Sequence, residues 1–221
     1  MVRSGVRFTH SVWRSPRQQT FVLIVGLVAV LVWSYVKLAP NAANPVEARL
    51  SILAAGAAAA IAVWGVVNQW AISRRQLTIQ HIANLETDRE YLSALRRFNI
   101  AAEREQSLKQ YAKGEPPEGV RKRKNSEDQA TYDKRQRDWM DDQSAIRKIL
   151  NQDEFIAIGI RKSILDYRLV CACWRGTITR RYSVSLEYIA ELRRVTRMPT
   201  MFIEIERFAE KLNRDYYHSL L

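Results

Sequence analysis

The strongest candidates for acid–base chemistry are Arg214 and His218, near the end of the chain. They are four residues apart, so in a helix both side chains lie on one face. A histidine that is held in place and shielded from water can transfer protons during bond cleavage. Only three residues follow His218, and chain ends fray. We therefore expect both side chains in a solvated tail, with cleavage chemistry as the alternative.

The two cysteines, Cys171 and Cys173, are separated by one residue. In a helix their side chains point about 200° apart, which is poor geometry for a shared metal ion. We expect both to be buried as small apolar side chains. The eight glycines form neither of the two glycine-rich patterns that bind phosphate groups. The sequence therefore predicts no metal, no cofactor and no catalytic residue, and we expect a protein that is not an enzyme.

Glu154 stands inside an apolar stripe of a predicted helix, next to Ile156 and Ile160. A buried carboxylate needs a cation or several hydrogen-bond donors. The candidate cations are Arg96 and Arg97, on the neighbouring predicted helix. We predict a structural ion pair between Glu154 and one of these two arginines.

Two long apolar stretches precede these residues. Residues 21–36 carry no charge, and residues 50–72 carry none over 23 positions. A helix of about 20 apolar residues crosses the hydrocarbon core of a bilayer, which is about 30 Å thick. We predict transmembrane helices at 21–39 and 50–72, joined by an outer turn at 40–49. This pattern excludes a free-standing soluble enzyme.

The basic residues predict the orientation of these helices. Residues 1–20 contain four arginines and no acid, and Arg74 and Arg75 follow the second stretch. Lys and Arg near the ends of a span stay on the cytoplasmic side. We therefore predict a multi-pass protein with a basic cytoplasmic N-terminus, a cytoplasmic domain at 73–221 and both termini in the cytoplasm. The alternative is a cleaved signal peptide with small residues at 42–43.

Small residues in the two spans indicate close helix packing. Gly56 and Ala60 have the small-xxx-small spacing that lets helices approach closely in lipid. We expect them to pack against the first span near Gly26, with dimerisation through the alanine face as the alternative. The middle of each span lacks an ionisable residue, which disfavours an oligomeric channel or transporter component.

Residues 73–221 show the spacing of amphipathic helices and no long strand pattern. One helix is predicted to run on from the second apolar stretch as far as Tyr111. The stretch 113–126 is rich in glycine, proline and charge and is predicted to be a flexible loop. The residues placed to cap the helices that follow are Ser126, Asp166 and Thr200. The expected fold class is all-α: a transmembrane hairpin followed by a cytoplasmic helical bundle.

The chain has a formal charge of +12, with 35 basic against 23 acidic residues. Basic residues beside a membrane attract anionic lipid. The candidate residues for contact with a membrane surface or another anion are Arg74, Arg75, Arg121, Lys122, Arg123 and Lys124. No aromatic residue interrupts the run at 121–124, and single-strand binders use such aromatics as stacking platforms. The sequence therefore favours membrane lipid over nucleic acid.

Three segments resemble the bacterial and phage domain-of-unknown-function family 4760. They read TIQHIANLETDREYLSALRRF, AIRKILNQDEFIAIGIRKSILD and FIEIERFAEKL. The family pattern places an acid, here Glu154, before an IAIGI-like run and a basic pair, here Arg161 and Lys162. The resemblance implies one or two N-terminal membrane helices before a helical domain, in the inner membrane of a bacterium. It assigns no reaction.

Arg214 and His218 also resemble the Arg-x4-His motif of helical ribonucleases of the HEPN superfamily, with one residue fewer between them. The sequence as a whole favours a non-enzymatic interaction or scaffold module, as a homo-oligomer or with an unidentified protein partner. The alternatives are a membrane-tethered nucleic-acid-binding protein or HEPN-like nuclease, and a channel or transporter component.

Overall fold

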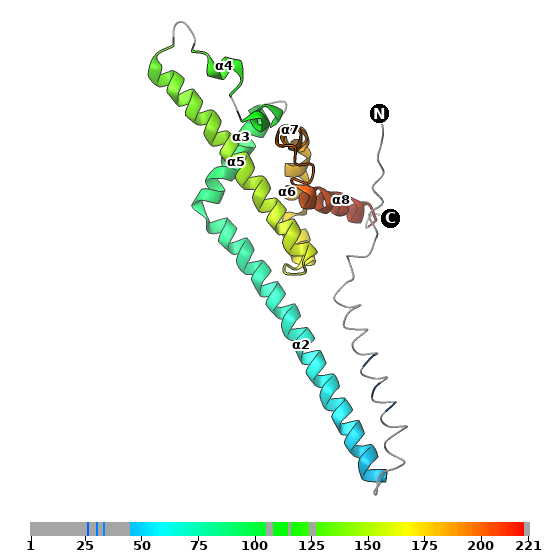
Figure 1. Ribbon diagram of the computed structural model, residues 1–221. Helices are drawn as coiled ribbons and strands as arrows, with labels where there is room; N and C mark the ends of the chain where they lie inside the picture. Colours follow the sequence, from blue (N-terminus) through cyan, green and yellow to red (C-terminus); the bar gives the residue numbers. More distant parts are fainter. Residues whose placement is uncertain are drawn as a thin grey trace, which may run out of the picture. The chain divides into compact units, whose positions relative to one another are not determined.

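The computed structural model describes residues 26, 30, 33, 45–104, 108–114, 116–123 and 127–218 (Figure 1). Over these residues the chain consists of helices and turns without strands, which confirms the expected all-α class. It divides into two compact units, residues 1–74 and 75–221, which we describe one at a time.

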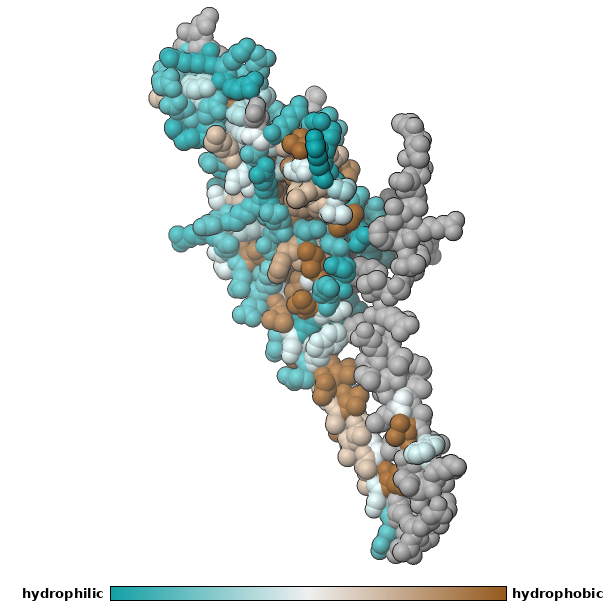
Figure 2. All heavy atoms as spheres, in the orientation of Figure 1, coloured by the Kyte–Doolittle hydropathy of each residue, from teal (hydrophilic) through white to brown (hydrophobic). Residues whose placement is uncertain are grey.

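The first unit contains most of helix α2 (Pro45–Thr87). Proline is well tolerated in the first turn of a helix, since its missing N–H would have no partner there. Within the described residues, Leu50–Thr87 is long and apolar enough to cross a membrane, by length and composition. Figure 2 shows brown and pale spheres along this part of α2 and mostly teal spheres over the second unit.

The first predicted span, 21–39, lies outside the described residues except at Gly26, Val30 and Trp33, which are helical. Residues 45–49 of the outer turn predicted at 40–49 are helical, because α2 already begins at Pro45; residues 40–44 lie outside the described residues.

The second unit holds the end of α2 and the remaining helices. Their bounds are α3 Arg89–Arg104, the 3₁₀ helix η2 Leu108–Lys113, α4 Glu118–Arg121, α5 Gln129–Arg161, α6 Tyr167–Val184, α7 Leu186–Thr196 and α8 Ile203–His218. Helix α5 is central: α3 packs along one part of it and α8 along another, while α8 also packs on α6 and α7 on η2 (Figure 1). The largest completely buried side chains include Phe98, Ile146, Ile149, Leu150, Ile156 and Ile205.

The predicted continuous helix as far as Tyr111 is wrong, because the chain leaves the helical conformation at Asp88. The Asp88 carboxylate accepts hydrogen bonds from the N–H groups of Glu90 (2.8 Å) and Tyr91 (3.1 Å). An aspartate that binds the first free N–H groups of a helix is an N-cap. Asp88 therefore ends α2 and starts α3.

The predicted loop at 113–126 contains the short helix α4, which is attached to the first turns of α5. The Tyr132 hydroxyl donates to the Arg121 carbonyl at 2.7 Å, and the Gln136 amide donates to the Val120 carbonyl at 2.6 Å. Helix α5 is capped by Asp128, whose carboxylate accepts from the Thr131 N–H at 2.7 Å. The cap predicted two residues earlier, at Ser126, is therefore wrong.

A tight turn joins α5 to α6. The N–H of Ser163 donates to the Ile160 carbonyl at 3.0 Å, and the N–H of Ile164 donates to the Gly159 carbonyl at 2.8 Å. Ser163 has a φ of 58°. This pair of hydrogen bonds with a left-handed residue is a Schellman motif. Asp166 then caps α6, as predicted, by accepting from two backbone N–H groups of its first turn.

Gly159 allows close packing where the turn folds back over the end of α5. A Cβ built on Gly159 would lie 2.8 Å from Leu165 Cδ1 and 2.9 Å from its Cγ. We expect Gly159→Ala to lower the free energy of unfolding by about 2 kcal/mol through overpacking, measured by thermal melting in detergent micelles. The matched control is Gly176→Ala in α6, where an added Cβ meets no atom within 4 Å. That change should leave stability unchanged or raise it by up to about 1 kcal/mol; equal effects at the two glycines would contradict the prediction.

Candidate functional site

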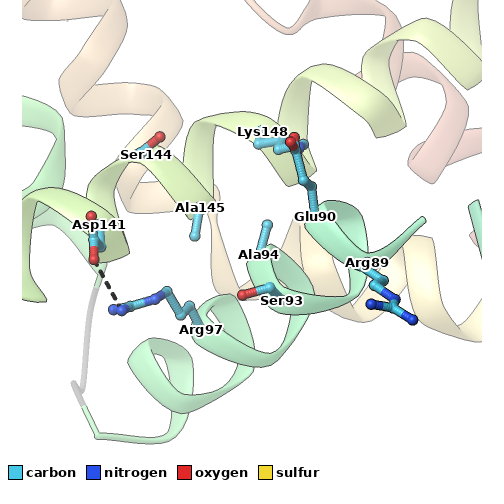
Figure 3. Close-up of a pocket in the computed structure, with 9 residues that line it drawn as sticks. All are labelled: Arg89, Glu90, Ser93, Ala94, Arg97, Asp141, Ser144, Ala145 and Lys148. Atoms are coloured by element: carbon cyan, nitrogen blue, oxygen red, sulfur yellow. Dashed lines mark hydrogen bonds and ion pairs between the residues drawn. The ribbon is translucent and has the colours of Figure 1, made fainter.

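The second unit has a shallow groove of about 370 Å³ between α3 and α5 (Figure 3). Ala94 and Ala145 face each other across it, and both are buried. Lys148 donates to Glu90 at 2.8 Å, and Arg97 Nη2 lies 3.0 Å from an Asp141 oxygen.

Each of these cations already has a carboxylate partner within the groove. The described lining also contains neither cysteine nor histidine. The groove is therefore a contact between two helices with ion pairs along its edges.

Asp142 lies beside this groove and is buried. Its two oxygens accept from Arg97 Nη1 at 3.3 Å and from Arg104 Nη1 at 3.5 Å. Burial raises the pKa of Asp142, and hydrogen bonding to Arg97 opposes the shift. Arg97 therefore joins α3 to two neighbouring carboxylates of α5.

The predicted ion pair of Glu154 with Arg96 or Arg97 is wrong. Arg97 is bound to Asp141 and Asp142, and Arg96 is exposed. The Glu154 carboxylate instead accepts from the backbone N–H groups of Glu204 at 3.2 Å and Ile205 at 2.6 Å. The donors that a half-buried carboxylate needs are supplied by a helix end and not by a side chain.

Glu154 thereby acts as the N-cap of α8 from a different helix. The residue before α8, Phe202, has a φ of 58° and no side-chain oxygen. The N–H groups of Glu204 and Ile205 are the second and third of the helix, which an N-cap side chain ordinarily binds. Thr200, predicted to cap this helix, stands too early, because α8 begins at Ile203.

We expect Glu154→Gln to lower the free energy of unfolding by about 1 kcal/mol. Glutamine keeps one acceptor oxygen but loses the charge, and charge-assisted hydrogen bonds are about twice as strong as neutral ones. Thermal melting of the full chain in detergent micelles measures the change. Glu210→Gln, at an exposed position of α8, is a control for a lost surface charge. A Glu154 variant no less stable than this control would contradict the capping role.

The most deeply buried ion pair among the described residues joins Asp153 and Arg181. Arg181 Nη1 donates to Asp153 Oδ1 at 3.0 Å and to the Tyr91 hydroxyl at 3.1 Å. Asp153 is 0% exposed, and its Oδ2 has no hydrogen-bond partner among the described residues. Burial raises the pKa of Asp153 to about 6, against the lowering effect of Arg181. The three side chains join α3, α5 and α6 inside the core.

Sequence reasoning missed this cluster, although a signal was present. Asp153 continues the stripe of Ile146, Ile149, Ile156 and Ile160 at spacings of three and four residues. Glu154 lies one position to the side of that stripe. Helical spacing therefore predicts that Asp153, and not Glu154, is the carboxylate that lies in the core.

The basic residues singled out from the sequence do not form one surface. Lys122 pairs with Glu118, and Arg123 donates to the Glu127 carbonyl at 2.8 Å. Lys124 lies outside the described residues. Lys122 and Arg123 lie beside the start of α5, whereas Arg75 lies 3.7 Å from Asp166, beyond the end of α5. A helix of 33 residues is about 50 Å long.

Arg74 belongs to the first unit, and its guanidinium carbon lies 5.2 Å from the centroid of the Trp70 ring. The small residues of this unit that the sequence singled out differ in exposure. Gly56 is buried, but Ala60 is exposed. No atom of the described part lies within 4 Å of a Cβ built on Gly26, so close packing at this glycine is not observed.

Exposure along α2 is reduced at every third or fourth residue. The less exposed positions are Ile52, Gly56, Ala59, Val63 and Val67. Their spacing puts them on one stripe of the helix. Gly56 therefore belongs with Ala59, one position before the predicted Ala60.

The structure does not bring the candidates for acid–base and thiol chemistry together in one described site. Arg214 is exposed, and the side chain of His218 lies outside the described residues. Asp215, between them, accepts a hydrogen bond from the Tyr167 hydroxyl. Cys173 is exposed, so its predicted burial is wrong, and Cys171 is partly buried. No group of three or more His, Cys, Asp or Glu able to hold a metal occurs among the described residues.

Comparison with models of protein families identifies the family of this chain. The family model described as Domain of unknown function (DUF4760) matches residues 52–212. No curated protein and no solved structure matches the chain. The matched range covers the apolar part of α2 and the second unit as far as the middle of α8, including Glu154, Gly159 and the buried Asp153–Arg181 pair. The chain belongs to the DUF4760 family.

Proposed function

We propose that the protein is a helical interaction module anchored in the inner membrane of a bacterium. One observation carries the proposal: the apolar side chains of α2 before the second unit are almost all exposed, among them Val66 at 70%. Large contiguous apolar surfaces on a protein mark contact with a membrane or a partner. The 23 uncharged residues at 50–72 have the length that a bilayer requires.

We further propose that residues 21–39 form a second membrane helix that packs against α2. The stripe of reduced exposure that contains Gly56 supports this arrangement. The arginines of residues 1–20, together with Arg74 and Arg75, favour a hairpin with both termini in the cytoplasm. Arg74 and Arg75 would then meet the lipid headgroups.

Cysteine labelling of spheroplasts tests the anchor and its topology. The native Cys173 is exposed and reports on the second unit. Single cysteines, Ser11→Cys and Asn41→Cys, are placed in a Cys171→Ser/Cys173→Ser background. We expect a membrane-impermeant maleimide to label Asn41→Cys in intact spheroplasts, and Ser11→Cys or native Cys173 only after lysis. Labelling of Ser11→Cys before lysis would indicate a single membrane span and contradict the hairpin. Release of the chain by alkaline washing would contradict the membrane anchor.

The partner that we propose first is a second copy of the chain. Alanine side chains that remain exposed on α2 support this choice: Ala54, Ala55, Ala57, Ala58 and Ala60. Small residues allow helix backbones to approach closely in lipid. Crosslinking in native membranes followed by purification should yield a homo-oligomer, and Ala57→Leu should weaken it. A stoichiometric protein partner would favour a scaffold, and bound RNA would favour the nucleic-acid alternative.

A further inference from the structure

We infer that the second unit rests on anionic lipid through the turn between α5 and α6. The surface consists of Arg75, Lys162, Ile164 and Arg168, and we refer to it as the turn surface. This inference rests on the membrane anchor proposed above, and it names the part of the helical unit that meets the leaflet.

The Schellman motif leaves an apolar side chain exposed at the turn. The residue in the position of Ile164 frequently packs against the residue whose carbonyl it binds. Here that residue is Gly159, which has no side chain, and Leu165 fills the space above it. Ile164 is therefore 55% exposed.

The exposed charged residues that the turn itself carries are positive. Lys162 and Arg168 are exposed and have no ion-pair partner among the described residues. The Arg75 side chain is 62% exposed and pairs at 3.7 Å with Asp166, whose own side chain is 7% exposed. Asp166 also accepts from the first N–H groups of α6. The only carboxylate of the turn is thus buried and engaged, and the turn surface presents cations around one aliphatic side chain.

The covalent chain keeps this surface close to the apolar stretch of α2. Arg75 follows Ile72, the last residue of that stretch, by three positions. Three residues span about 10 Å at most, and the headgroup layer is roughly 6 Å thick on each side of the hydrocarbon. Arg75 in turn is an ion-pair partner of Asp166. If the stretch at 50–72 crosses the bilayer, the chain length therefore places Arg75 within reach of the headgroups, and Arg75 is the member of the turn surface from which the proposed contact starts.

This combination matches the chemistry of a lipid interface. Apolar side chains enter the boundary between headgroups and acyl chains, and neighbouring Lys and Arg attract anionic headgroups. The basic run at 121–123 lacks this combination. Lys122 of this run pairs with the Glu118 carboxylate. The run also lies at the opposite end of α5, about 50 Å away.

The test places an environment-sensitive NBD fluorophore on the full chain in nanodiscs. Ile164→Cys and Met140→Cys are labelled separately in the Cys171→Ser/Cys173→Ser background. Met140 is the matched control, since it is 57% exposed on α5 and about 30 Å of helix away from the turn. In nanodiscs of phosphatidylcholine with phosphatidylglycerol, we expect the label at 164, but not at 140, to shift its emission to shorter wavelength and to be quenched by spin-labelled lipid.

Charge variants identify the cause of the contact. Lys162→Gln/Arg168→Gln should abolish the shift at 164, whereas Lys122→Gln/Arg123→Gln should leave it unchanged. Nanodiscs of phosphatidylcholine alone, or high salt, should weaken it, because salt screens charges beyond about 10 Å at 0.1 M. Circular dichroism verifies that each variant keeps its helix content.

The outcomes separate this inference from the proposed anchor. A chain that stays in the nanodisc but gives equal signals at 164 and 140 overturns the turn surface alone. A chain that does not stay in the nanodisc overturns the anchor and the turn surface together. A shift at 164 that survives the Lys162→Gln/Arg168→Gln change would overturn the role of the cations.

Discussion

Replacing Arg181 by methionine is expected to lower the free energy of unfolding by about 3 to 5 kcal/mol at neutral pH. Among the described residues, Arg181 is the only cation that pairs with Asp153, at 3.0 Å, and its guanidinium also donates to the Tyr91 hydroxyl. Methionine fills a similar volume but leaves a completely buried carboxylate without a partner. Thermal melting of the full chain in detergent micelles should record a decrease in Tm of about 10 °C or more.

A double variant distinguishes the lost ion pair from poor packing. Asp153→Leu/Arg181→Met removes both charges, and well-packed apolar replacements of buried ion pairs are often neutral or stabilising. We expect it to recover most of the stability that Arg181→Met loses. Arg180→Met, one residue earlier and exposed, should change the free energy of unfolding by less than about 1 kcal/mol. A double variant as unstable as Arg181→Met would show that the ion pair is not the cause.

The free energy of unfolding should decrease as the pH rises from about 4 to 6, by up to about 3 kcal/mol through Asp153 alone. The pKa of Asp153 is about 6 in the folded state, against an ordinary value of 3.8. The folded state therefore binds this proton more tightly than the unfolded state does. The stabilisation that protonation provides is complete below the unfolded-state pKa and is lost as the pH rises through the folded-state pKa.

The measurement is the difference between the wild-type chain and Asp153→Asn, because other carboxylates titrate in the same range. Burial also raises the pKa of Asp142 and Glu154, and both are present in the variant. Between pH 4 and 6 we expect the stability of the wild type to fall relative to that of Asp153→Asn, by up to about 3 kcal/mol, and above pH 7 we expect the two curves to run parallel. Parallel curves across the whole range would contradict the raised pKa of Asp153.

Local rules predicted much of the fold. Helical spacing of apolar residues led to the all-α class, and the aspartate before Tyr167 led to the correct cap of α6. The helix break at Asp88 was missed because the apolar spacing continues on both sides of it. The helix ends where the Asp88 carboxylate accepts hydrogen bonds from the N–H groups of Glu90 and Tyr91, and the apolar spacing does not encode this geometry.

The candidate site was harder to predict, because its pairings are between distant segments. The need of Glu154 for donors followed from its apolar surroundings. The identity of those donors depends on how α8 approaches α5, and no residue near Glu154 in the sequence encodes this. Arg181 posed the same difficulty, since Arg180 and Arg181 are alike in the sequence and only the rotation of α6 selects the one that enters the core.

The bond from Glu154 to the start of α8 has a consequence for hydrogen exchange. Amide hydrogens in the first turn of a helix ordinarily exchange freely, because no carbonyl of the same helix binds them. The amides of Glu204 and Ile205 are bound by a carboxylate that lies 50 and 51 residues earlier in the chain. Their exchange therefore requires α8 to separate from α5, and not merely to fray. These two amides are natural probes of the opening of the C-terminal helix within the intact bundle.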